Sequence, residues 1–128
     1  MIKQGMTIFY VSDQKTSKSF YAKVFGHIPS LDVPGMSEFQ LGEGMTFGLM
    51  PHSGIKKLLG QKIFHNESSK SPQAELYVLV DDAQVYLDRA LSAGAYPLLP
   101  LELRDWGDNV AYCLDPDGHV LAFAETGK

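Results

Sequence analysis

The side chain best suited to do chemistry in this sequence is one glutamate at the start of a predicted strand. Glu75 opens an apolar run, and strand alternation places it on the same face as Tyr77 and Leu79. A carboxylate among apolar and aromatic side chains is desolvated, so Glu75 could act as a general base or bind a cationic group. The alternative is a residue that points into solvent or across a dimer interface.

Aromatic residues are the second set of candidates. Trp106 is the only tryptophan, and it precedes a strand in a loop that also contains Asp105 and Asp108. Trp106 could stack on a planar or cationic ligand together with Tyr10 and Tyr112, or it could close one end of a barrel. Asp108 could bond the ligand, or instead its own turn. The predicted ligand-binding residues are Tyr10, Tyr77, Trp106, Tyr112 and Asp108, with Glu75 as the catalytic candidate.

The histidines favour no metal site. His119 follows a turn glycine, but alternation places it on the face opposite Ala122, so a structural histidine is the preferred interpretation. The other three, His27, His52 and His65, have no recognisable ligand spacing. Two of them fall in the segment 52–73, whose composition predicts a linker with one short helix or arm.

These candidates must be positioned by elements that repeat along the chain. In each half a buried strand leads to an aspartate that can cap a helix, and that helix ends at Gly26 or Gly94. Turns 42–44 and 115–118 then lead into a final apolar strand in each half. The predicted strands are 6–11, 38–41, 45–50, 75–80, 98–103, 110–114 and 119–124, with a further short one near 30–33.

The repeat predicts an α+β fold of two βαβββ modules, which form a cupped, half-open mixed β-barrel with flanking helices. The 128 residues fit one domain, with repeat 1 at about 1–51, a linker at 52–73 and repeat 2 at about 74–128. A net charge of -4 disfavours a nucleic-acid partner, and no apolar run approaches the roughly 20 residues that span a bilayer. The single Cys113 and the lack of a signal segment predict a cytoplasmic protein with a buried, unreactive thiol.

The motifs together resemble the vicinal oxygen chelate superfamily, which includes glyoxalase I, extradiol dioxygenases and the fosfomycin- and bleomycin-resistance proteins. The resemblance implies a cup around a small-molecule site, commonly in a homodimer. It covers most of the chain outside the linker. The matching motifs are Val11-Ser12-Asp13, Phe20-Tyr21, Phe25-Gly26, Val80-Asp81-Asp82, Ala93-Gly94, Trp106-Gly107-Asp108 and Asp115-Pro116-Asp117-Gly118-His119.

Metal-dependent relatives take their ligands from the first and last strand of each repeat, and those positions are Met6, Gly48, Glu75 and Ala122 here. A catalytic divalent ion needs several nitrogen or oxygen donors, and only Glu75 offers one. The resemblance therefore implies the branch without a metal, with Met6, Gly48 and Ala122 as vacant ligand positions. A register slip of one residue supplies no better ligands.

The leading hypothesis is a metal-free, homodimeric protein that sequesters a hydrophobic or aromatic compound and needs no cofactor. One alternative is a glyoxalase-like lyase or isomerase in which Glu75 is the base or a ligand of a divalent metal. Another is a protein-interaction module whose cup is filled by its own side chains, and a pocket below a few hundred Å³ would favour it. No nucleic acid or membrane partner is expected.

Overall fold

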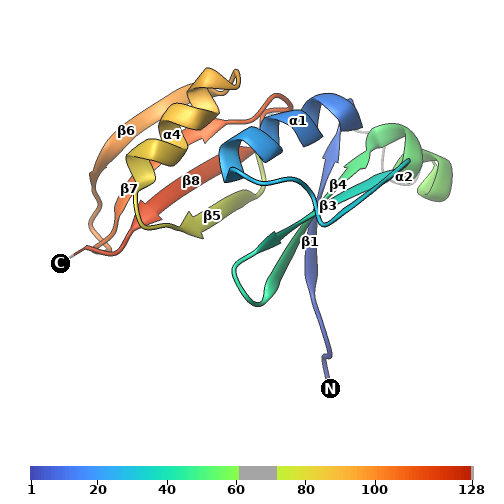
Figure 1. The fold of residues 1–128 in the computed structure, drawn as a ribbon, viewed down its shortest axis with the longest axis horizontal. Coiled ribbons are helices and arrows are strands. Elements are labelled where there is room, and N and C mark those ends of the chain that lie inside the picture. Colours follow the sequence, from blue (N-terminus) through green and yellow to red (C-terminus); the bar gives the residue numbers. More distant parts are fainter. Residues whose placement is uncertain (61–71, 128) are drawn as a thin grey trace. The chain divides into compact units, whose positions relative to one another are not determined.

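The computed structural model describes residues 1–60 and 72–127 (Figure 1). Strands and helices alternate in two similar series, each of which begins with a strand and a helix. In chain order the elements are β1 Met6–Val11, α1 Gln14–Phe25, β2 Leu31–Val33, β3 Met36–Leu41, β4 Met45–Pro51, α2 His52–Leu59, β5 Glu75–Leu79, α4 Ala83–Ser92, β6 Tyr96–Leu103, β7 Asn109–Leu114 and β8 Val120–Glu125.

The strands form two separate four-stranded sheets with the same topology. Their orders are β1-β4-β3-β2 and β5-β8-β7-β6. In each sheet the first strand pairs in parallel with the last strand of its series, and the other pairs are antiparallel. The predicted α+β class with two βαβββ modules is therefore confirmed, and hydrogen bonding does not close the described strands into one barrel.

Each module is a compact unit and is described by itself below. The first unit holds β1 to β4, α2 and most of α1, while the second holds β5 to β8 and α4 and also includes Lys23–Phe25 from the end of α1. Among the described residues, no helix combines the length and the apolar character needed to cross a membrane.

In the first unit, one face of the sheet packs on α1. Phe47 contacts Phe9 and Tyr21 edge to face, with ring centroids 5.0 and 4.9 Å apart. All three are buried, and burial of a side chain of this size contributes roughly 1.5–3 kcal/mol. Of the two predicted caps, Ser12 and Asp13, it is Asp13 that caps α1, because its Oδ2 accepts from the backbone N–H of Thr16. The opposite face of this sheet is left uncovered by α1.

In the second unit, α4 covers one face of the sheet. Phe123 lies under Tyr86 of the helix, with the ring centroids 5.9 Å apart, and Leu121 and Cys113 are buried on the same side. Because side chains alternate along a strand, Ala122 and Ala124 lie on the face turned away from α4. That second face holds most of the predicted site residues.

Several expectations about individual elements are met and others need correction. The short strand near 30–33 exists as β2, and the segment 52–73 opens with the helix α2. The strand predicted at 98–103 starts two residues earlier and contains Pro97 and Pro100. An edge strand tolerates proline, and the β6–β7 pairing shifts register at these positions. His65 falls in the part of the linker outside the described residues.

Candidate functional site

The candidate site lies on the face of the second sheet that α4 does not cover. Glu75, Tyr77 and Leu79 alternate along β5 with the buried Leu76, and all three are exposed. Their partners on β8 are Val120, Ala122 and Ala124, and Tyr112 of β7 is in register with Ala122. The strand register thus places Tyr77 and Tyr112 on either side of Ala122, on one face.

A chain of hydrogen bonds connects three of the predicted residues. The Tyr77 hydroxyl donates to Asp108 Oδ2 at 2.6 Å and accepts from the Trp106 indole N–H at 3.0 Å. Desolvation raises the pKa of Tyr77, and so does its bond to the Asp108 carboxylate, while the bond from Trp106 acts in the opposite direction. Tyr77 therefore stays a neutral phenol at neutral pH and holds both loop residues against the sheet.

Tyr112 lies within the influence of two charged residues, Glu75 and Arg104, and Arg104 was not among the predicted site residues. Desolvation raises the pKa of Tyr112, and the negative charge of Glu75 raises it further, while the positive charge of Arg104 lowers it. The guanidinium carbon of Arg104 lies 5.6 Å from the Tyr112 ring centroid. Its only sequence signal was its place just before the loop of Trp106. Five predicted residues and one new one, Arg104, are thus linked on this side of the second sheet.

Arg104 is also a structural anchor for its loop. Its Nε and Nη2 donate to the carbonyl oxygen of Val110 at 3.2 and 2.8 Å, and Nη2 donates to that of Pro100 at 2.7 Å. Glu102 lies 3.6 Å from its Nη1. Most of the hydrogen-bond donors of the guanidinium therefore already bind groups of the protein.

The turn between β7 and β8 is stabilised by a buried aspartate. Asp115 Oδ1 accepts from the backbone N–H groups of Asp117 and His119, and its Oδ2 lies 2.8 Å from His119 Nδ1. Gly118 has a φ of 87°, in the left-handed region that glycine adopts without strain. His119 is thus tied to its own turn, as the structural interpretation predicted.

The remaining predicted residues lie in the first unit, on the sheet face away from α1. Tyr10 and Met6 of β1 are each more than one-third exposed. Gly48 lies beside them, and a Cβ added there would come within 3.2 Å of Met36 Sδ and 3.6 Å of Met6 Sδ. Glu38 pairs with Gly48 across β3 and β4, which the sequence analysis did not notice. That Tyr10 shares a pocket with Trp106 stays a prediction.

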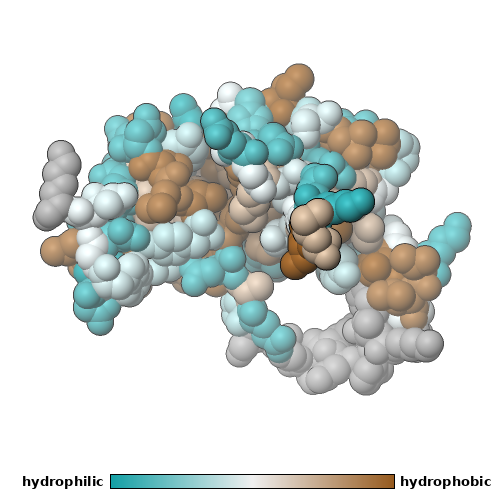
Figure 2. Space-filling model, turned by 90° about the horizontal axis from the view of Figure 1, so that it is seen from below, coloured by the Kyte–Doolittle hydropathy of each residue, from teal (hydrophilic) through white to brown (hydrophobic). Residues whose placement is uncertain are grey.

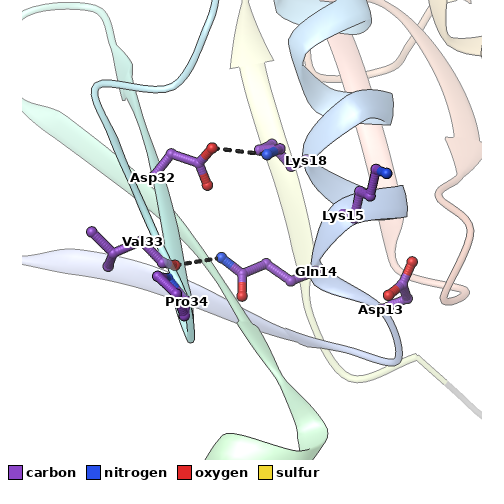
Figure 3. Close-up of a pocket in the computed structure, with 7 residues that line it drawn as sticks. All are labelled: Asp13, Gln14, Lys15, Lys18, Asp32, Val33 and Pro34. Carbon is purple, nitrogen blue, oxygen red and sulfur yellow. Dashed lines mark hydrogen bonds and ion pairs between the residues drawn. The ribbon is translucent and has the colours of Figure 1, made fainter.

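A cavity of about 440 Å³ lies in the first unit beside the start of α1 (Figure 3). Its polar side chains bind neighbouring groups of the lining. Lys18 contacts Asp32 at 2.8 Å, and Gln14 donates to the backbone carbonyl oxygen of Val33 at 2.8 Å. The bond from Lys18 lowers the pKa of Asp32 below its usual value, with a smaller contribution from Ser37. These contacts fasten the β2–β3 hairpin to α1, so their role is structural.

Comparison with known proteins supports the resemblance seen in the sequence. The model of the glyoxalase-like domain matches residues 4–126. The chain belongs to the glyoxalase-like family. It is 28% identical over 112 residues to an uncharacterised protein of Mycobacterium bovis, covering 85% of this chain and 74% of that protein. A similar match to an uncharacterised protein of Mycobacterium tuberculosis covers 66% of that protein, about two thirds of its length.

Solved structures of glyoxalase-like proteins share the fold. A glyoxalase-related enzyme from Fulvimarina pelagi superposes with a TM-score of 0.80 at 22% identity, covering 98% of this chain and 89% of that one. A glyoxalase/bleomycin resistance protein/dioxygenase family enzyme from Burkholderia phytofirmans has a TM-score of 0.79 at 18% identity, covering 94% and 96%. At these identities the likeness concerns the fold alone.

The residues at the four ligand positions do not fit a catalytic divalent ion. The strand register supports the equivalence of the two repeats, because Met6 pairs two residues before Gly48 and Glu75 pairs two residues before Ala122. Only Glu75 carries an oxygen donor, and a thioether such as that of Met6 suits soft ions instead. Within the ranges 1–60 and 72–127, no group of three or more His, Cys, Asp or Glu residues could hold a metal ion.

Proposed function

We propose that this glyoxalase-like protein binds a hydrophobic or aromatic small molecule without a metal, as a sequestering protein of the bleomycin-resistance-like kind. The observation that carries the proposal is the Tyr77 hydrogen-bond chain. It fixes Trp106 beside a sheet face whose centre is the small Ala122. Trp106 is 56% exposed and Tyr77 37%, so both rings offer area to a ligand.

The metal-free part of the proposal rests on the chemistry of the donors. A divalent ion held by Glu75 alone would keep most of its coordination sphere as water and would exchange freely. Calorimetric titration with Zn²⁺, Ni²⁺, Mn²⁺ and Fe²⁺ should therefore show no stoichiometric tight binding. Tight binding of one ion per chain that also switches on a lyase reaction would overturn the proposal.

A second candidate is a lyase or isomerase that uses Glu75 as a general base. The observation that favours it is that Glu75 lies on the same face as Tyr112 and its charge raises the pKa of that phenol, although its side chain is exposed and not enclosed by apolar and aromatic residues as the base role assumed. The Glu75→Gln variant separates the two functions, because a base-dependent enzyme loses turnover while a binder of neutral aromatic compounds keeps its affinity. Wild-type protein assayed with the same compounds is the reference.

The proposal extends to the setting in which the protein works. We expect a cytoplasmic homodimer that does not bind nucleic acid, and the net charge of -4 accords with the absence of a polyanion partner. Figure 2 shows apolar and polar residues mixed over the side of the molecule in view.

A further inference from the structure

We propose that the sheet face around Tyr77 binds a planar aromatic compound that carries a positively charged nitrogen, either quaternary or protonated. This rests on the proposed function and deepens it, because it assigns a charge to the compound and a counter-charge to the protein. The face is formed by five residues that all belong to the second unit: Glu75, Tyr77, Trp106, Asp108 and Tyr112.

Two acidic side chains, Asp108 and Glu75, belong to this face. Asp108 is held at the edge of the face by the 2.6 Å bond from Tyr77, and the charge of Glu75 reaches Tyr112 on the other side of Ala122. The raised pKa of Tyr77 keeps its proton in the bond to Asp108, so the phenol neutralises no charge. Two carboxylates therefore act on this face: Asp108 is bonded to Tyr77, and Glu75 lies on the same sheet face as Tyr112 and raises its pKa.

The nearest cation, Arg104, offsets part of this charge, because it lowers the pKa of Tyr112, but its hydrogen bonds go to the protein backbone. The Arg104 guanidinium is half-buried, donates to two backbone carbonyls and is paired at 3.6 Å with a third acid, Glu102. Glu75, Glu102 and Asp108 thus outnumber Arg104, and Asp105 adds a further acid in the loop of Trp106. An anionic ligand would be repelled by the carboxylates of Glu75 and Asp108, and Arg104 already binds protein groups. A cationic ligand would be attracted by the same two carboxylates.

The aromatic rings of Trp106 and Tyr112 also favour a flat, positively charged ligand. Trp106 donates its N–H to Tyr77, which anchors one edge of the indole, and 56% of the residue stays exposed. The electron-rich face of an aromatic ring attracts a cation, most strongly for tryptophan. The stack of Arg104 on Tyr112 already shows a cation against one ring of this face. Flat shape and positive charge are thus both favoured.

The test uses three probes of one shape and different charge: N-methylquinolinium, quinoline and quinoline-2-carboxylate at neutral pH. Because Trp106 is the only tryptophan, its indole N–H gives a single NMR resonance that reports binding at this face. We expect N-methylquinolinium to bind roughly tenfold tighter than quinoline, with the carboxylate weakest. Salt should reduce the advantage of the cation.

Variants assign the preference to the carboxylates. Glu75→Gln should lower the ratio between the affinities of N-methylquinolinium and quinoline several-fold, and Asp108→Asn should do the same if it folds. Glu43→Gln, which removes an exposed carboxylate from the β3–β4 turn, should leave the ratio unchanged. Equal binding of the cation and quinoline, or a preference that survives both variants, would overturn the charge assignment alone. If no probe shifts the Trp106 resonance, the proposed binding function fails as well.

Discussion

At the scale of single residues, Tyr77 organises the candidate site. Its hydroxyl is donor to Asp108 and acceptor from Trp106, so one atom positions both residues of the loop before β7. Tyr77 was expected on the same face as Glu75, where β5 places it, and Trp106 and Asp108 were separate candidates. Sequence spacing could not show the link, because 29 and 31 residues separate Tyr77 from its partners.

Removing the Tyr77 hydroxyl should release the loop. In Tyr77→Phe we expect the Trp106 indole resonance to shift as its N–H turns to water, and the affinity for N-methylquinolinium to fall. The free energy of unfolding should fall by only about 0.5–1.5 kcal/mol, because both partners are exposed to solvent. Tyr96→Phe, at an exposed position of β6, is the matched control. An unchanged indole resonance would show that the bond does not hold Trp106.

Cys113 should be unreactive in the folded protein. Burial raises the pKa of its thiol to about 12, with a smaller contribution from Asp115. The folded pKa lies above the unfolded value of about 8.5. The contribution of the protonated thiol to the free energy of unfolding is therefore fully present below that pH and is lost as the pH rises toward 12. Ellman's reagent should therefore label the protein slowly at mildly alkaline pH and rapidly in urea. Rapid labelling of the native state would contradict a buried thiol.

At the scale of elements, the last strand of the second unit fastens its helix. Glu125, in β8, accepts from the backbone N–H of Ala83 through Oε2 at 2.6 Å, at the start of α4. Asp82 caps the same helix through the more distant N–H of Val85, at 3.4 Å. A carboxylate at a helix N-terminus satisfies an unpaired donor and complements the helix dipole. The sequence predicted Asp81 or Asp82 as the cap from their place before the helix, but Glu125 lies 42 residues beyond Ala83 in the chain.

We expect Glu125→Ala to lower the free energy of unfolding by about 1–2 kcal/mol, because it leaves the Ala83 N–H without its acceptor. Asp81→Ala, an exposed acid beside the cap, should change it by less than about 0.5 kcal/mol. Urea denaturation followed by circular dichroism measures both. Equal effects of the two substitutions would show that the Glu125 bond contributes no more than general electrostatics.

At the scale of the whole molecule, the question is whether two chains associate. The resemblance implies a homodimer, and the edge strand β6 leaves Tyr96 and Leu103 about two-thirds exposed. Exposed apolar side chains at a sheet edge favour association. Light scattering coupled to gel filtration should give twice the mass of the 14.1 kDa chain. The mass of a single chain at micromolar concentration would show that the dimer prediction is wrong.

The repeated βαβββ plan could be read from the amino-acid sequence, because its signals are local: apolar runs of strand length, capping aspartates and glycine turns. The sequence also determined that Met6, Gly48 and Ala122 offer no oxygen or nitrogen donor, since side-chain chemistry does not depend on the fold. Only the tertiary structure decided that Tyr77 joins Trp106 to Asp108 and that Arg104 stacks on Tyr112. These contacts follow from strand register and loop path, which bring together residues that are distant in the chain.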